Sequence, residues 1–294
     1  MDKYAPTVYR TLNGVFSVYK PFGFTMKESC VSLQVKLAKE LNTMKTRPVR
    51  ERVLIHEENL HSGLPITTTA PDLSDHPLVM AIGEGRRYLK GIARSRYIRT
   101  YHVTGQLGIA TQDFTPTGRI IQQMTYDHVT HGKMDRVIAA MQASHQKFMF
   151  EATGLSRDSQ EAYEIASHGL IRPDIKQAGP VVFGMKCIHF EPPEFILEIH
   201  SVNEDCTYLR RIVHLLAAGM KTGAVCTQIR RIRYGKFTLA HALLQKHWKS
   251  EHILDCIENC RSLVDWNNLS RDLQSNEVNF IKDKGDNETD LEKK

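Results

Sequence analysis

Apolar and polar positions along the chain follow two periods in turn, and this pattern predicts strands interleaved with helices. Strands are predicted at 15–19, 99–111, 181–190, 194–202 and 228–238. The clearest helix is predicted over 132–147, where Met134, Val137, Ile138 and Met141 stand at i, i+3, i+4 and i+7. Further helices are predicted at 30–42, 158–169, 207–220 and 239–248, the last of them capped by Thr238. Because no strict β-α-β repeat appears, the pattern indicates an α+β fold with a mixed sheet.

The stretch HPLVMAIGEGRRYLKG, residues 76–91, joins two predicted elements abruptly. Its apolar run passes through Gly83 and Gly85 into an arginine-rich helix. A strand that turns through glycine into a helix N-terminus is one way to hold a phosphate. The pair of glycines lacks the further glycines of a dinucleotide site and the Lys-Ser/Thr pair of a P-loop. A nucleic-acid contact, or a join between pieces that usually lie further apart, therefore stays open.

Basic residues are distributed unevenly. The chain has 39 Lys and Arg against 33 Asp and Glu, a net charge of +6, yet the stretches 86–99 and 207–236 hold no acidic residue. Two acid-free basic runs favour a polyanionic partner, although a solvated face explains any single arginine equally well. The candidate RNA-contacting residues are Arg86, Arg87, Lys90, Arg94, Arg99, Arg230 and Arg231.

The sequence gives little support for a metal site or a membrane span. In HEENLH, residues 56–61, a helix would place the two histidines roughly 140° apart, so the polar-loop interpretation is preferred over a zinc site. His252, Cys256 and Cys260 share one helical stripe that could hold a soft metal, but without a fourth ligand a packed helix face is preferred. The six cysteines form no CxxC pair, which suits free thiols in a reducing compartment. No apolar run approaches the roughly 20 residues of a membrane span.

Three fragments, taken in order, carry a family resemblance. They are VYKPFGFT at 18–25, RTYHVTGQLGIATQDFTPTGRI at 99–120, and TYLRRIVHLLAAGM with CTQIRRIRYGKFTL within 207–239. The intervening SHQKFMF and AYEIASHGLIRP add a fourth match. In this order the chain resembles the TruB family of pseudouridine synthases over about residues 13–245, and is most similar to its mitochondrial mRNA branch.

The resemblance implies a fold and a domain organisation. The fold is a mixed, mainly antiparallel sheet flanked by helices. We expect an N-terminal extension at 1–12, a catalytic and RNA-binding domain at 13–265 with an irregular insertion at 43–75, and a polar, disordered tail at 266–294. As in the mitochondrial branch, no C-terminal PUA module is recognised.

The resemblance also implies a cofactor-free isomerase that flips a uridine out of RNA and rejoins its base to the ribose through C5. Tyr101 matches the aromatic residue on which the base stacks. Arg210 matches the arginine that pairs with the catalytic carboxylate, and Lys20 the lysine that supports the catalytic loop and positions RNA. RNA and mitochondrial RNA-processing proteins are the implied partners. Mitochondrial localisation rests on the resemblance, because MDKYAPTVYR is a poor presequence.

The catalytic carboxylate itself is not found. The family places it in a Gly-x-Leu-Asp-x-x-Ala-x-Gly-Val-Leu pattern directly ahead of the helix that AIGEGRRYL resembles, and no such pattern precedes that stretch. Asp72 and Asp75 are weak substitutes without the Leu-Asp pair, and Asp113 belongs to a turn after the Tyr101 strand. We therefore expect the segment to be absent and one central strand lost or replaced. Arg210 would then lack its partner, and the sheet core would be under-filled.

Three hypotheses follow. The first is a pseudouridine synthase by descent whose activity is impaired or lost because the segment is missing through alternative splicing, an incomplete gene model or true loss. The second is a catalytically silent RNA-binding protein of the same fold, such as an RNA chaperone or an RNA-granule component. The third is a truncated product that folds poorly and has no function.

Overall fold

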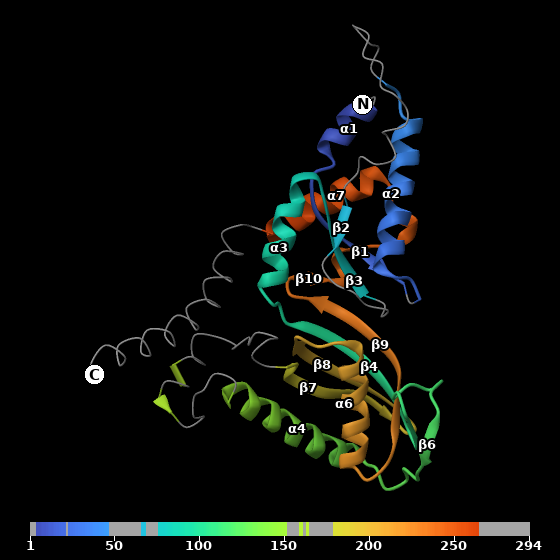
Figure 1. The fold of residues 1–294 in the computed structure, drawn as a ribbon, viewed down its shortest axis with the longest axis vertical. Coiled ribbons are helices and arrows are strands. Elements are labelled where there is room, and N and C mark those ends of the chain that lie inside the picture. Colours follow the sequence, from blue (N-terminus) through green and yellow to red (C-terminus); the bar gives the residue numbers. More distant parts are fainter. Residues whose placement is uncertain are drawn as a thin grey trace, which may run out of the picture. The chain divides into compact units, whose positions relative to one another are not determined.

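A computed structural model of the chain describes residues 4–21, 23–46, 66–68, 76–151, 159–160, 163–164 and 179–264. It divides into two compact units, shown in Figure 1. Unit 1 comprises Met1–Ser95 and Gly235–Arg271, and unit 2 comprises Arg96–Tyr234 and Asp272–Lys294. The mixture of helices and mainly antiparallel strands confirms the predicted α+β class.

Unit 1 is built on a sheet in the order β11-β1-β3-β2. Its strands are β1 (Gly14–Lys20), β2 (Ile66–Thr68), β3 (His76–Ile82) and β11 (Ala242–Leu243). Strand β3 runs antiparallel to both β1 and β2, whereas β11 pairs with β1 in parallel. In the described part of this unit four helices accompany the sheet, namely α1 (Ala5–Thr11), α2 (Met26–Thr43), α3 (Arg86–Arg94) and α7 (Ser250–Arg261), with 3-10 turns at Gly83–Gly85, Leu239–His241, Gln245–His247 and Ser262–Val264. Strand β10 (Phe237–Thr238) also belongs to this unit.

The abrupt stretch at 76–91 forms a central strand that runs directly into a helix. Strand β3 lies between β1 and β2, and the side chains from Leu78 to Ile82 are at most 1% exposed. A continuous apolar run buried on both faces is what such a central position requires. The strand position at the expected join is therefore occupied, which does not fit an under-filled sheet at this place.

Helix α2 begins earlier than the apolar pattern predicts. The Thr25 side chain accepts a hydrogen bond from the Glu28 backbone N–H (3.2 Å), and the Glu28 carboxylate accepts one from the Thr25 backbone N–H (2.8 Å). This capping box satisfies donors that the first turn leaves free. Leu33, Leu37 and Leu41 then form the buried stripe of the helix.

Unit 2 contains an antiparallel sheet in the order β9-β4-β8-β7. Its strands are β4 (Arg99–Leu107), β7 (Val181–Glu191), β8 (Glu194–Val202) and β9 (Ala224–Tyr234), and a separate hairpin pairs β5 (Ile109–Thr111) with β6 (Ile120–Gln123). Helix α6 (Cys206–Gly219) covers one face of the sheet and α4 (His131–Glu151) packs along β7. The predicted strand at 99–111 is two strands, because Gly108 turns the chain at a φ of +100°.

One expectation is wrong in part, and a second is described only in part. The helix predicted at 239–248 is a 3-10 turn, then β11, then another 3-10 turn, because Ala242 and Leu243 pair with β1. Tertiary pairing has overridden local helix propensity there. The irregular insertion at 43–75 contains strand β2, and the rest of it between 47 and 75 lies outside the described residues.

Other expectations fall largely beyond the described part of the chain. The helix predicted at 158–169 is described only at 159–160 and 163–164, and the tail at 266–294 is not described. None of the helices that are described is long and apolar enough to cross a membrane.

Candidate functional site

A buried group of charged and aromatic side chains lies beside strands β4 and β9 of unit 2. Oε1 of Glu204 accepts hydrogen bonds from the Tyr101 hydroxyl (2.6 Å) and from Nη1 of Arg99 (2.8 Å). The guanidinium carbons of Arg99 and Arg231 each lie 5.4 Å from the centre of the Tyr234 ring. We call these five residues the Glu204 cluster, and all five belong to one unit.

The local sequence explains how these groups meet. Arg99 and Tyr101 stand two residues apart on β4, so both side chains leave the same face of the strand. Tyr101 is paired with Arg231 of the neighbouring strand β9. Glu204 comes from the short connection between β8 and α6, where Asn203 turns the chain at a φ of +63°. Asparagine tolerates this left-handed conformation better than most residues.

Burial decides the electrostatics of the cluster. Tyr101 is 1% exposed and the Glu204 side chain is fully buried. Burial, with the nearby charge of Glu204, raises the pKa of Tyr101 above its ordinary value despite the opposing charges of Arg231 and Arg99. Burial alone would lower the pKa of Arg99, but the attraction of Glu204 outweighs it and raises that pKa. Arg99 thus supplies the charge partner that a buried carboxylate needs.

This placement bears on the predicted role of Tyr101 as a stacking platform. With the side chain 1% exposed, a base reaches the ring only after the ring has been uncovered. The hydroxyl is already committed to Glu204, so a base that uncovers the residue could stack only on a face of its ring.

Arg210 lies half-buried on helix α6 of unit 2. Its charge helps to lower the pKa of Asp113, for which the larger cause is the hydrogen bond from the Thr115 hydroxyl (2.8 Å). Burial raises the pKa of Cys226 to about 12, against the opposing charge of Arg210. The carboxylate of Asp113, a predicted turn residue, therefore lies within the electrostatic reach of Arg210.

Lys20 belongs to unit 1 and is fully buried at the end of β1. Its Nζ donates hydrogen bonds to the backbone oxygens of Phe24 (2.8 Å) and Pro21 (3.4 Å). These bonds hold together the turn that joins β1 to α2. The lysine therefore stabilises its own loop, while Tyr101 and Arg210 lie in the other unit.

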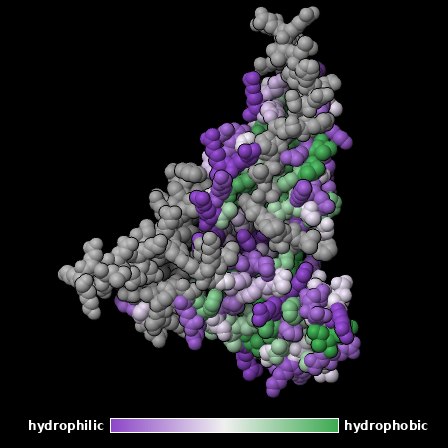
Figure 2. Space-filling view, viewed as in Figure 1, coloured by the Kyte–Doolittle hydropathy of each residue, from purple (hydrophilic) through white to green (hydrophobic). Residues whose placement is uncertain are grey.

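The predicted RNA-contacting residues divide into exposed and buried groups. Four of them, on α3, are exposed: Arg86, Arg87, Lys90 and Arg94. Arg87 forms an ion pair with Glu84 (2.6 Å). Strongly hydrophilic side chains gather over α3 in Figure 2. By contrast Arg231 is 3% exposed, Arg230 is half-buried and Arg99 is paired with Glu204, so α3 carries the accessible part of the predicted surface.

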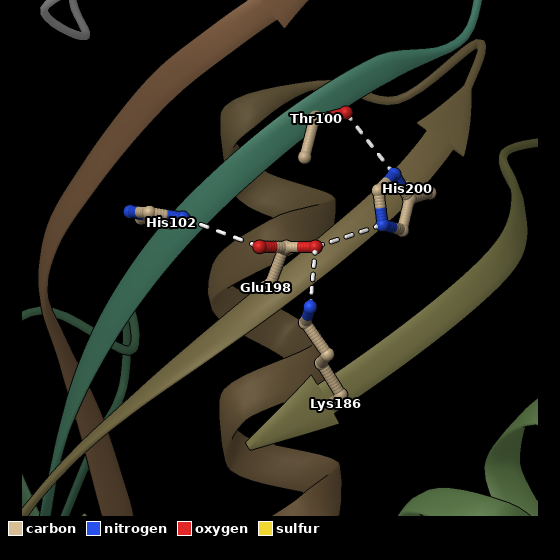
Figure 3. Close-up of polar contacts among 5 residues, drawn as sticks. All are labelled: Thr100, His102, Lys186, Glu198 and His200. Atoms are coloured by element: carbon tan, nitrogen blue, oxygen red, sulfur yellow. Dashed lines mark hydrogen bonds and ion pairs between the residues drawn. The ribbon is translucent and has the colours of Figure 1, made fainter. Parts of the chain in front are cut away.

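A second polar group, which the sequence analysis did not single out, lies on the sheet of unit 2. Figure 3 shows the Glu198 carboxylate between Nε2 of His200 (3.0 Å), Nζ of Lys186 (3.1 Å) and Nε2 of His102 (3.5 Å). Nδ1 of His200 lies 3.0 Å from the Thr100 hydroxyl. The signal in the sequence is the alternation in EFILEIHSV, where Glu198 and His200 take the positions between buried residues.

The remaining candidates include residues that the structure describes and residues that it does not. Cys256 and Cys260 are buried on α7 with their sulfurs 3.9 Å apart, as a packed helix face predicts. Across the described residues, no three metal-binding side chains come together to hold an ion. Asp72 and Asp75 lie outside the described residues, as do His56 and His61.

Comparison with known proteins supports the resemblance seen in the sequence. The model of the TruB family pseudouridylate synthase N-terminal domain matches residues 77–208. The mitochondrial pseudouridylate synthase TRUB2 of Xenopus tropicalis is 37% identical over 292 residues, covering 89% of this chain and 90% of the relative. Human TRUB2 is also 37% identical, covering 84% of this chain and 83% of the relative.

Among solved structures, a chain of an H/ACA RNP bound to a substrate RNA containing 2'-deoxyuridine aligns with a TM-score of 0.46 and 14% identity. The alignment covers 81% of the present protein and 52% of the chain in the H/ACA RNP. Because relatives more than a third identical align over most of both sequences, the chain belongs to the TruB family of pseudouridylate synthases.

Proposed function

We propose that this chain is an RNA-binding pseudouridine synthase by descent whose uridine isomerisation is impaired or lost because the segment with the catalytic aspartate is missing. One observation carries the proposal. Strand β3 passes through Gly83–Gly85 directly into α3, so the position where the family pattern would stand is taken by Leu78–Ile82 and three turn residues.

The alignment with the Xenopus relative supports a missing segment. It extends over 292 positions but occupies 89% of the 294 residues of this chain, which is about 262 residues. About 30 positions of the alignment therefore have no counterpart in this chain. The family model begins to match only at residue 77, within β3.

The chemistry explains why the loss would matter. The family reaction breaks the C1′–N1 bond of a uridine, turns the base and forms a C1′–C5 bond, with one proton moving from C5 to N1. It needs no external reactant and no cofactor, but a carboxylate must attack or deprotonate the ribose. Arg210 is the matching partner for that carboxylate, and an arginine keeps such an acid ionised. Without the aspartate, Arg210 holds a site that has no nucleophile.

RNA binding without turnover is the second candidate function, and the basic residues of helix α3 support it. The exposed arginines and lysine of α3 are independent of the missing carboxylate and can still contact phosphates. A silent RNA-binding protein, acting as an RNA chaperone or in an RNA granule, fits these residues. The continuous burial of β3 favours both candidates over a chain that cannot fold.

Mitochondrial RNA is the proposed substrate class, because both TRUB2 relatives are named as mitochondrial. The proposed compartment is the mitochondrion, and the proposed partners are RNA and mitochondrial RNA-processing proteins.

The purified chain should be incubated with transcripts of mitochondrial RNA, with RNA affinity measured by fluorescence anisotropy and pseudouridine mapped in the product. We expect binding without product. Pseudouridine formation would overturn the proposed impairment, and absence of RNA binding would overturn both candidate functions.

Sequencing the transcript across the codons of Val79 and Met80 tests the missing segment directly. An in-frame exon there that encodes a Leu-Asp pair would identify this chain as an incomplete version of an enzyme. An uninterrupted genomic sequence across these codons would instead indicate true loss of the segment.

A further inference from the structure

Glu204 is a buried acid that neither the family motifs nor the charge pattern singles out. We propose that Glu204 is a positioning residue for base recognition, in which one carboxylate oxygen fixes both the ring of Tyr101 and the guanidinium of Arg99. The inference rests on the RNA binding proposed above and adds a residue to that site.

The geometry of the two hydrogen bonds supports a positioning role. Both donors reach the same oxygen of Glu204, the Tyr101 hydroxyl at 2.6 Å and the Arg99 guanidinium at 2.8 Å. Bonds to a charged acceptor in a buried site are short and strongly directional. Because Tyr101 and Arg99 leave the same face of β4, one acceptor is sufficient to fix both side chains.

The anchor leaves the ring of Tyr101 able to stack. The hydrogen bond joins the para oxygen, at the end of the ring, so it constrains the plane of the ring without occupying either face. An extruded base that uncovers the ring would meet an aromatic plane already held in one orientation. Preorganisation of this kind improves affinity because less side-chain freedom is lost on binding.

The connection that carries Glu204 is itself well defined. The left-handed turn at Asn203 precedes it, and Asp205 follows as the N-cap of α6, accepting a hydrogen bond from the Tyr208 backbone N–H (2.6 Å). The side chain therefore enters the cluster from a fixed point between β8 and α6. The other carboxylate oxygen, Oε2, is buried and has no hydrogen-bond partner among the described residues.

A purely structural role for Glu204 makes a different prediction from a positioning role. If the carboxylate only holds unit 2 together, its loss would weaken the binding of a strand with bases and of a strand without bases to the same degree. If it positions Tyr101, its loss would weaken the part of binding that depends on the base and spare the part that depends on phosphate. The ratio of affinities for two probes separates these possibilities.

The probes are a 12-nucleotide oligouridylate and an abasic ribose-phosphate strand of the same length. The full chain should bind the oligouridylate more tightly, by about 5- to 150-fold, the range that base–aromatic stacking supplies. Glu204→Gln keeps the shape of the side chain and removes its charge, and should reduce this ratio at least about fivefold. Glu198→Gln is the matched control, since Glu198 lies in the separate polar group of Figure 3, and should leave the ratio unchanged.

Tyr101→Phe provides the second variant in case Glu204→Gln does not fold. It retains the ring and removes only the hydroxyl that Glu204 accepts, so it should reduce the ratio in the same direction. An unchanged ratio in either folded variant would overturn the positioning role. Equal binding of both probes by the unaltered chain would also overturn it while leaving RNA binding intact. Failure to bind either probe would refute the proposed function itself.

Discussion

At the scale of single residues, Gly85 and Gly91, six positions apart in unit 1, provide a matched test of packing. A Cβ at Gly85 would collide with the backbone of Gly14, whereas a Cβ at Gly91 on α3 would meet open space. Gly85→Ala should lower the free energy of unfolding by about 1–3 kcal/mol, the usual cost of overpacking. Gly91→Ala should leave it unchanged or raise it by about 0.5–1 kcal/mol, because alanine favours helix. Urea denaturation followed by circular dichroism measures both, and equal effects would contradict the close approach at Gly85.

The acid of the second polar group predicts a pH dependence of stability. Partial burial acts to raise the pKa of Glu198, but the hydrogen bond and charge of Lys186, with the two histidines, outweigh it and lower that pKa. A lowered pKa in the folded state means that the stabilisation is present at neutral pH and is lost as pH falls through the folded pKa.

Glu198→Gln should therefore reduce the free energy of unfolding by about 0.5–1 kcal/mol at pH 7, and the deficit should begin to shrink below about pH 4.3 and disappear once the pH lies below the lowered folded-state pKa. Glu194→Gln at the exposed start of the same strand is the control, with little expected effect at either pH. A deficit of Glu198→Gln that persists unchanged at low pH would show that the loss comes from shape rather than charge.

Residues that stand in motifs could be predicted from the sequence, whereas their hydrogen-bond partners could not. Lys20, Tyr101 and Arg210 could be named in advance because they stand in short local patterns. Glu204 could not, because its hydrogen bond to Tyr101 spans 103 residues and no local pattern encodes that distance. Next to the capping residue Asp205, an acid at 204 looks like an ordinary helix-start residue.

At the scale of elements, helix α3 is where charge and fold combine in a testable way. Its exposed basic residues, if they contact phosphates, release counterions on RNA binding. Lys90→Ala combined with Arg94→Ala should reduce the slope of log affinity against log salt by about 1.4 on single-stranded RNA. Glu84→Gln should act in the opposite direction, because it removes the acid that pairs with Arg87. Salt titrations of binding decide this, and an unchanged slope in the double variant would exclude α3 from the interface.

Elements with a clear period were predicted well and those held by tertiary pairing were not. The strand at 194–202 and the helix over 132–147 match β8 and α4, since each has a regular apolar stripe that faces a core. The segment 239–248 has helix-forming residues, but it contributes β11 to the sheet beside β1. Its two paired residues depend on a strand more than 200 positions away, which a local pattern does not contain.

At the scale of the whole molecule, the proposed function combines a substrate-holding framework with a missing reaction centre. Each unit has its own sheet and core, and the residues matched to the family motifs belong to both, with Lys20 in unit 1 and Tyr101 and Arg210 in unit 2. The structure therefore predicts that binding and chemistry are separable in this protein. Adding back one segment should restore the chemistry and leave RNA binding as it is.

If the proposed function holds, a form with a segment of about 30 residues that carries the Leu-Asp pattern inserted between Val79 and Met80 should convert uridine to pseudouridine, whereas the present chain should not. In the restored form Arg210→Met should lower the rate at least about 100-fold, because the aspartate loses the cation that keeps it ionised and aimed. The acid limb of its pH–rate profile should move up by about 1–3 units for the same reason. RNA affinity should change little in either form, since α3 is untouched.

Single-turnover kinetics on a mapped substrate measure these effects. A restored form that binds RNA but makes no product would show that the missing segment is not what prevents catalysis.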